Sequence, residues 1–206
     1  MADKMLQEKK KIRNQTKLVR GGLYRSSHGE TSEAIFMNSG YVFDNAEQAE
    51  ARFAGEQEGY LYSRYGNPTV EMFQDRLCLI EGAEACRATA SGMAAVFASL
   101  ACQVKAGQRI VASRALFGSC AYILTDILPN YGIETVLVDG TKLDQWRDAL
   151  DEPTAAIFLE TPSNPGLEII DLPSVAKLAH AVGAQVVVDN VFATPLLQQP
   201  LQLGAD

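Results

Sequence analysis

The chain has 206 residues, of which 47% are hydrophobic and 21% are charged. This composition is typical of a soluble globular protein, and the length predicts one large domain plus an appendage. A formal charge of −7 and a pI near 4.9 argue against nucleic acid or an anionic membrane as the main partner, because both require a basic surface. The charge does not argue against a small-molecule substrate.

The cysteine and histidine pattern favours reduced thiols and no metal. The four cysteines form no CxxC pair, which is usual for the cytoplasm. The two histidines lie outside any cluster with metal-ligand spacing, so we expect no metal site. The basic first twenty residues lack the apolar stretch of a signal peptide, and no window is apolar enough to span a membrane. We therefore expect a cytoplasmic protein. The residues concerned are Cys78, Cys86, Cys102, Cys120, His28 and His180.

Residues 1–66 have no long regular pattern and are predicted to form an N-terminal arm with one short helix over 46–53. The arm ends in a polar and aromatic loop. Residues 67–206 are predicted to form the first part of an α/β domain. Its first helix begins at Asn67-Pro68, because proline suits the first helical turn, and it stops at Gly82.

Strand-like and helix-like segments then alternate to the end of the chain. Several of the strands are nearly continuous apolar runs, which a parallel sheet covered by helices on both faces requires. The predicted fold is therefore α/β and doubly wound. We expect strands over 86–90, 109–113, 133–139, 155–160 and 185–190, and helices over 91–104, 119–128, 143–150, after Pro173, and over 196–203.

Ser91 and Gly92 stand where the first predicted strand runs into a helix. The free amides and the positive dipole end of such a helix form an anion site, and a glycine lets a phosphate approach the backbone. A plain N-cap explains Ser91 equally well. Neither a GxGxxG nor a GxxxxGK[ST] motif is present, so the common nucleotide signatures are missing.

Other polar residues follow the strands, where ligands of open parallel sheets bind. Asp189 ends the most hydrophobic strand, and a carboxylate there is costly unless it meets a cation, a metal or a ring N–H; simple capping is the alternative. Asn164 lies between two prolines that restrict its loop, although an ordinary Asx turn would look the same. Phe117 could stack on a planar ligand or belong to the core. Together these residues indicate a phosphorylated aromatic heterocycle with a ring nitrogen.

Four motifs in this order resemble the pyridoxal-phosphate enzymes of cysteine and methionine metabolism. This family includes cystathionine γ-synthase, cystathionine and methionine γ-lyases, and homoserine-ester sulfhydrylases. The resemblance covers roughly residues 16–206 and implies a fold type I large domain, like that of aspartate aminotransferase. The motifs are YSRYGNPT at 62–69, ASGMAA at 90–95, TPSNP at 161–165 and VDN at 188–190.

The resemblance also implies residue roles for a pyridoxal 5'-phosphate site. The amides of Gly92 and Met93, with Ser91 at the same turn, would bind the cofactor phosphate. Asp189 would pair with the protonated pyridine nitrogen, which keeps the ring an electron sink. Asn164 would bond the phenolic oxygen. A separate group, Tyr62 and Arg64, would reach the phosphate of a neighbouring subunit, so a homodimer or homotetramer is implied.

Two departures from the family pattern bear on the activity. Phe117 stands where many members have a tyrosine, so stacking survives and the hydroxyl is lost. Val191 stands where many members have a threonine after the Asp-Asn pair. The hydrogen bonds that this threonine makes around the ring therefore do not carry over to this chain. The segment 116–119 and Tyr41-Val42-Phe43 are most similar to the O-succinylhomoserine sulfhydrylases. The resemblance therefore favours homocysteine formation from an acylated homoserine and sulfide in methionine biosynthesis.

Other activities stay open on the sequence alone. A cystathionine γ-synthase is one alternative, and a cystathionine or methionine γ-lyase is another. The resemblance implies that the Schiff-base lysine falls a few residues past Asp206 and that a C-terminal domain follows. If so, a hypothesis outside the enzyme activities is that the 206 residues alone are a non-catalytic fragment or an assembly module.

Overall fold

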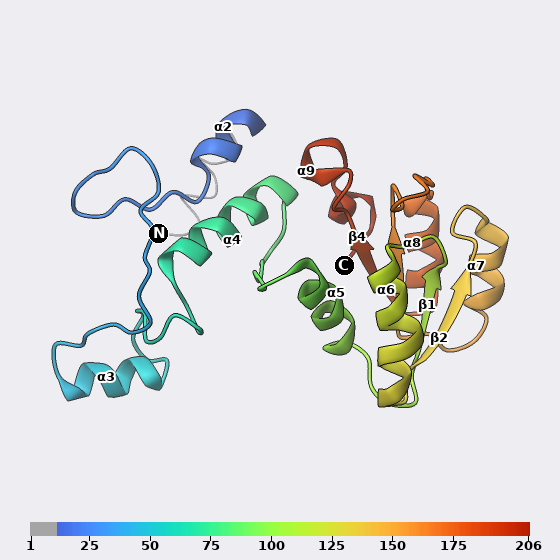
Figure 1. Ribbon diagram of the computed structural model, residues 1–206, viewed down its shortest axis with the longest axis horizontal. Helices are drawn as coiled ribbons and strands as arrows, with labels where there is room; N and C mark the ends of the chain where they lie inside the picture. Colours follow the sequence, from blue (N-terminus) through green and yellow to red (C-terminus); the bar gives the residue numbers. More distant parts are fainter. Residues whose placement is uncertain (1–11) are drawn as a thin grey trace. The chain divides into compact units, whose positions relative to one another are not determined.

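A computed structural model describes residues 12–206 and divides the chain into two compact units, Met1–Ala88 and Thr89–Asp206. Residues 1–11, which begin the predicted arm and its basic stretch, lie outside the described residues. Figure 1 shows the elements of both units in chain order. Within residues 12–206, every helix is too short or too polar to cross a membrane.

The first unit consists of helices joined by long irregular segments. Its longest helix, α4, begins after Asn67, whose side chain accepts the Thr69 N–H at 2.9 Å, and ends at Gly82 in the left-handed conformation. Both ends agree with the prediction. The Arg76 side chain of α4 donates to the Gly21 carbonyl at 2.8 Å, which fixes the segment after α2 against α4. The described helices are α2 (Asn14–Arg20), α3 (Ala46–Phe53) and α4 (Pro68–Glu81).

The second unit is built on a four-stranded sheet in the order β2-β1-β3-β4, with every neighbouring pair parallel. The predicted α/β class and parallel sheet are confirmed. From β1 the chain passes to β2 on one side and then to β3 on the other, so the order reverses at β1. Such a reversal opens a crevice at the carboxyl ends of the strands. The strands are β1 (Arg109–Ser113), β2 (Glu134–Val138), β3 (Ala156–Glu160) and β4 (Gln185–Asp189).

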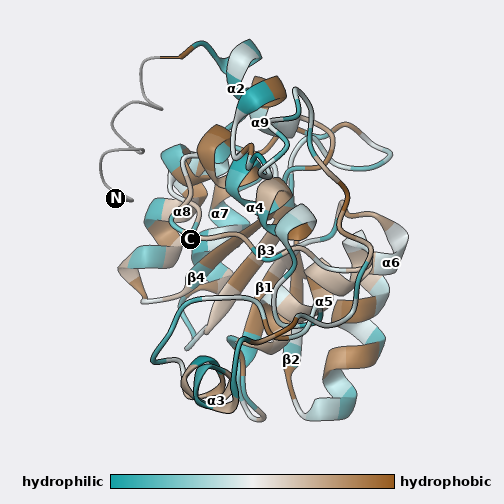
Figure 2. Cartoon of the chain, turned by 90° about the vertical axis from the view of Figure 1, so that its left-hand side faces the viewer, coloured by the Kyte–Doolittle hydropathy of each residue, from teal (hydrophilic) through white to brown (hydrophobic). Residues whose placement is uncertain are grey.

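Helices cover both faces of this sheet, and the two cores follow from strand alternation. Ile157 and Leu159 of β3 pack with Trp146 on the face covered by α7 and α8. Phe158 lies on the opposite face, in a core with Leu100 of α5 and residues of α6. In Figure 2 the strands are largely brown, as expected for a sheet buried on both faces. The helices are α5 (Gly92–Ala101), α6 (Gly118–Tyr122), α7 (Leu143–Ala149) and α8 (Leu172–Ala181).

The predicted strand over 86–90 was wrong. No strand within the described residues pairs with this segment, and the N–H of Ala88 instead donates to the Gln74 side chain at 2.9 Å. A strand needs a neighbour for its backbone groups, and local sequence says nothing about whether one is present.

Two predicted helices differ in form. The helix over 119–128 continues from α6 as a π-helix, η1 (Ile123–Ile127), and then a 3-10 turn, η2 (Leu128–Tyr131). Pro129 has no N–H for the α-helical ladder, which favours the change of winding. The helix over 196–203 is split into α9 (Thr194–Leu197) and a 3-10 turn, η3 (Pro200–Leu203). Pro200 again removes a donor in the middle of the predicted helix.

Candidate cofactor site

One pocket of the second unit, of about 630 Å³, lies at the carboxyl ends of β3 and β4. Its walls come from the start of α5 and from the segments that follow β1, β3 and β4. The structure therefore brings together six of the eight predicted site residues, from four separate segments. They are Ser91, Gly92, Met93, Phe117, Asn164 and Asp189.

The start of α5 has open amides that face no protein acceptor. The Ser91 hydroxyl accepts the Ala94 N–H at 3.1 Å, so this serine does act as a cap. The amides of Gly92 and Met93 have no hydrogen-bond acceptor among residues 12–206. A Cβ added at Gly92 would meet no atom within 4 Å. Because helix N-termini favour anions, this corner of the pocket suits a phosphate.

Two acids that line the pocket lie side by side at the edge of the sheet. Glu160 ends β3 and Asp189 ends β4, and the two positions are directly paired in the parallel ladder. Glu160 lies two residues after Phe158, and Asp189 lies two residues after Val187. Phe158 and Val187 belong to the core that faces α5 and α6, so the alternation of side chains along a strand directs both carboxylates to that face. Neither acid forms an ion pair within the part of the chain that the structure describes.

Asp189 is only partly satisfied by the protein. Its Oδ1 accepts the Val191 N–H at 3.0 Å, and its Oδ2 faces the Cys120 thiol at 3.9 Å. Burial and the charges of Asp189 and Glu160 raise the pKa of Cys120 to about 12, so this thiol stays protonated at neutral pH. A cationic N–H placed beside Asp189 would find an acceptor without displacing an existing ion pair.

Glu160 is the most buried acid of the site, with a side chain only 1% exposed. Its Oε2 accepts the Phe117 N–H at 2.8 Å, and its Oε1 has no hydrogen-bond partner within residues 12–206. Burial raises the pKa of this carboxyl, and the charge of Asp189 adds to the effect. The nearby amides of Phe117 and Asn164 oppose the shift, although the Asn164 amide makes no well-formed bond to Oε1.

Asn164 is presented by a tightly tied loop. The Ser163 hydroxyl accepts the Glu168 N–H, and the Thr161 hydroxyl accepts the Ile170 N–H, each at 3.0 Å. Gln198 also donates to the Thr161 carbonyl at 2.8 Å. The Asn164 side chain itself makes no hydrogen bond within the described residues and is free to bind a ligand at the pocket wall.

The two remaining predicted residues, Tyr62 and Arg64, belong to the first unit and line no part of this pocket. The Arg64 guanidinium lies 5.4 Å from the Tyr62 ring centre and 5.3 Å from that of Tyr65. Arg64 has no acidic partner among residues 12–206, so its charge is available to an anion.

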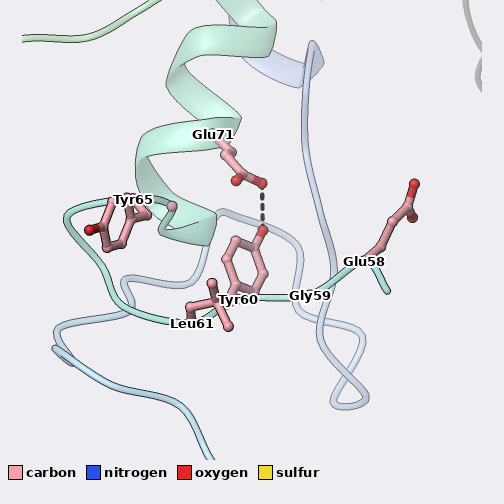
Figure 3. Close-up of a pocket in the computed structure, with 7 residues that line it drawn as sticks. Glu58, Gly59, Tyr60, Leu61, Tyr65 and Glu71 are labelled. Carbon is pink, nitrogen blue, oxygen red and sulfur yellow. Dashed lines mark hydrogen bonds between the residues drawn. The ribbon is translucent and has the colours of Figure 1, made fainter. Parts of the chain in front are cut away.

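The loop that carries these residues is anchored to α4. Figure 3 shows the Tyr60 hydroxyl pointing at Glu71 across a small pocket, and this hydrogen bond is 2.6 Å long. Burial and the Glu71 carboxylate raise the pKa of Tyr60 above its ordinary value, so the hydroxyl keeps its proton as the donor. The anchor limits the freedom of the segment that ends in Tyr62 and Arg64.

The reversed strand order, the open helix amides and the acid at the carboxyl edge of the sheet match a pyridoxal-phosphate domain of fold type I. The chain belongs to the Cys/Met metabolism PLP-dependent enzyme family, whose profile matches residues 15–206.

Three relatives show the range of activities in this family. The chain is 59% identical to an O-succinylhomoserine sulfhydrylase of Mycobacterium tuberculosis, over 91% of this chain and 46% of that protein. It is 40% identical to an L-methionine γ-lyase of Fusobacterium nucleatum, over 97% and 51%. A Campylobacter jejuni structure assigned as an O-acetylhomoserine (thiol)-lyase and containing N'-pyridoxyl-lysine-5'-monophosphate has a TM-score of 0.89 at 33% identity, over 95% and 48%. The chain thus spans about half the length of these relatives.

The pocket fits the cofactor of this family, pyridoxal 5'-phosphate. Open amides suit its phosphate, and an acid without an ion pair suits a protonated ring nitrogen. Phe117, 42% exposed, offers an aromatic surface at the pocket wall. Residues 12–206 contain no group of three or more His, Cys, Asp or Glu side chains arranged to hold a metal ion.

Sequence reasoning gave no site role to several residues of the pocket, among them Glu160 and Cys120. Glu160 carries the same signal as Asp189, an acid that ends an apolar strand, and could have been found by it. Cys120 had no such signal, since its neighbours in sequence predict only a buried helical position.

Proposed function

We propose that the whole protein, with any sequence that flanks this chain, is a pyridoxal-phosphate transferase. It replaces the succinate on the γ-carbon of O-succinylhomoserine with sulfide and so forms homocysteine for methionine biosynthesis. The observation that carries the choice is Phe117, an aromatic residue without a hydroxyl at the pocket wall. The similarity to the mycobacterial sulfhydrylase supports the same choice.

The roles proposed for this chain's residues follow from their surroundings. When bound, the cofactor supplies an electron sink for the negative charge that develops at the substrate α-carbon. Asp189 holds a proton on the ring nitrogen, and the amides of Gly92 and Met93 bind the phosphate. Asn164 donates to the phenolic oxygen. Phe117 packs on the ring and excludes water from that side.

The proposed assembly is a cytoplasmic homodimer or homotetramer. Tyr62 and Arg64 of one subunit bind the cofactor phosphate held by its neighbour. The support is the charge of Arg64, which has no acidic partner among residues 12–206 and lies near the rings of Tyr62 and Tyr65 on an anchored loop.

Substrate competition tests the proposed activity. The whole protein is assayed with O-succinylhomoserine or O-acetylhomoserine as acceptor, and with sulfide or cysteine as donor. The highest kcat/KM is expected for O-succinylhomoserine with sulfide. Faster formation of cystathionine from cysteine would instead identify a synthase.

A γ-lyase is the second candidate, favoured by the similarity to the Fusobacterium methionine γ-lyase. A lyase would release ammonia and a keto acid from methionine or cystathionine without a second substrate. We expect this release to be slow, because Phe117 has no hydroxyl to move a proton. Rapid release of ammonia from methionine would decide for the lyase.

A further inference from the structure

Glu160 is costly to keep where it lies. Its carboxylate is buried, one of its two oxygens has no hydrogen-bond partner within residues 12–206, and Asp189 occupies the paired position on β4. An apolar residue of similar size is often neutral or stabilising at such a place, because it avoids desolvating a charge. Apart from the one backbone N–H that it accepts, stability of the fold therefore gives little reason for an acid at the end of β3.

Glu160 does hold one specific group, the N–H of Phe117. Phe117 is the N-cap of α6, and its own side chain offers no capping atom. The segment between β1 and α6 is otherwise tied at Arg114, whose N–H donates to Val138, and at Ala115, whose N–H donates to Ser113. The Phe117 carbonyl accepts the N–H groups of Cys120 and Ala121 at the start of α6, and the bond to Glu160 is the one that holds the Phe117 N–H.

We propose that Glu160 is a positioning residue that fixes the Phe117 ring as one wall of the cofactor pocket. The carboxylate acts through the Phe117 backbone and does not itself touch the cofactor. This inference rests on the proposed cofactor site, and it is independent of which acylated homoserine or sulfur donor the protein uses.

A binding assay with the whole, cofactor-stripped protein tests the role. The probe is 4'-deoxypyridoxine 5'-phosphate, which has the ring and the phosphate but no aldehyde, so its binding needs no lysine. Glu160→Ala removes the acceptor, and we expect the dissociation constant to rise about tenfold, as for a lost charge-assisted hydrogen bond. Glu160→Gln keeps an acceptor oxygen, and binding is expected within about threefold of the unmodified protein. Equal binding by the alanine variant would overturn the proposal.

A double-mutant cycle separates positioning from general damage. If Glu160 acts through Phe117, adding Glu160→Ala to Phe117→Ala changes binding by less than about twofold, since coupled residues are non-additive. Fully additive losses would overturn the proposal. If the alanine variant fails to fold, Glu160→Leu replaces it in the same cycle, because leucine keeps the volume but has no acceptor.

Two controls complete the experiment. Glu134→Gln makes the same charge change at an exposed position at the opposite end of the sheet, and its binding should equal that of the unmodified protein. Failure of the unmodified protein to bind the probe would refute the cofactor site itself. Failure of the proposed substrate assay, with the binding pattern intact, would refute the activity and leave the role of Glu160 standing.

Discussion

Glu160 and Asp189 are directly paired across β3 and β4, and both carboxylates face the same pocket. Within residues 12–206 neither has a cationic partner. Two adjacent acids in an apolar setting repel each other, and a bound cationic ring would relieve that repulsion. A cationic ring bound beside the two acids should therefore stabilise the folded protein more than a neutral ring of the same shape.

Replacement of Asp189 tests the acid assigned to the ring nitrogen. Asp189→Asn keeps the shape but removes the charge that would hold the ring proton. We expect kcat/KM of the whole protein to fall about a hundredfold, in the range seen when one preorganised electrostatic group is lost. The ¹⁵N chemical shift of labelled cofactor should move toward that of a neutral pyridine. Asp151→Asn, at an exposed turn, is the control, and unchanged turnover in Asp189→Asn would refute the assignment.

The pH dependence of stability tests the environment of Glu160. Burial raises its pKa in the folded protein above the ordinary value of 4.5, so the folded state binds this proton more tightly than the unfolded state does. The contribution of Glu160 to the free energy of unfolding is thus most favourable in acid. This contribution is lost as the pH rises above about 4.5. Glu160→Gln removes the titration, so its stability relative to the unmodified protein should increase from pH 4.5 towards neutrality. Melting temperatures of cofactor-free protein would show this, and parallel pH curves would contradict it.

Arg64 tests the proposed contact between subunits. Arg64→Ala removes the free cation, and we expect the affinity for pyridoxal phosphate to fall about tenfold, as for a lost charge-assisted bond to phosphate. The Arg64→Lys variant keeps the charge but loses the planar stacking on Tyr62 and Tyr65, so its loss should be smaller. Dissociation constants from fluorescence titration give the comparison.

Mixed dimers identify the subunit that Arg64 serves. One subunit carries Arg64→Ala and the other carries Asp189→Ala. If Arg64 reaches the neighbouring site, one of the two sites regains both native residues and activity returns. Mixed dimers whose remaining site keeps the weaker cofactor affinity of Arg64→Ala would show that Arg64 acts within its own subunit.

Cys120 should be unreactive in the folded protein. Its thiol is 2% exposed, and its pKa is raised to about 12, so little thiolate exists at pH 8. Iodoacetamide at pH 8 should label Cys120 only after denaturation, whereas the exposed Cys102 provides the comparison in the native state. Mass spectrometry of the peptides measures both sites, and early labelling of Cys120 would contradict the buried environment.

The fold was predictable where local chemistry is decisive. Asn67, Pro68 and Gly82 determine both ends of α4, and the apolar runs of β1, β3 and β4 predict strands of a parallel sheet covered by helices. The segment 86–90 could not be predicted in this way, because its strand-like composition is meaningful only beside a partner strand. The π-turn at η1 depends on a donor missing six residues after its start, at Pro129.

Single residues of the candidate site were predictable from the sequence, but the contacts between them were less so. Asp189, Asn164 and Gly92 were found because each follows a strand or opens a helix. Glu160 ends an apolar strand as Asp189 does and could have been found by the same signal, but its contact with Phe117 could not. Its bond to Phe117 joins residues 43 positions apart, which only the folded sheet brings together.

The position of bound pyridoxal 5'-phosphate in a crystal structure of the whole protein tests the central claim most directly. We expect phosphate oxygens about 3 Å from the amides of Gly92 and Met93, and the ring nitrogen at a similar distance from the Asp189 carboxylate. The ring should lie against Phe117. A cofactor bound elsewhere, or a ring nitrogen out of reach of Asp189, would contradict it.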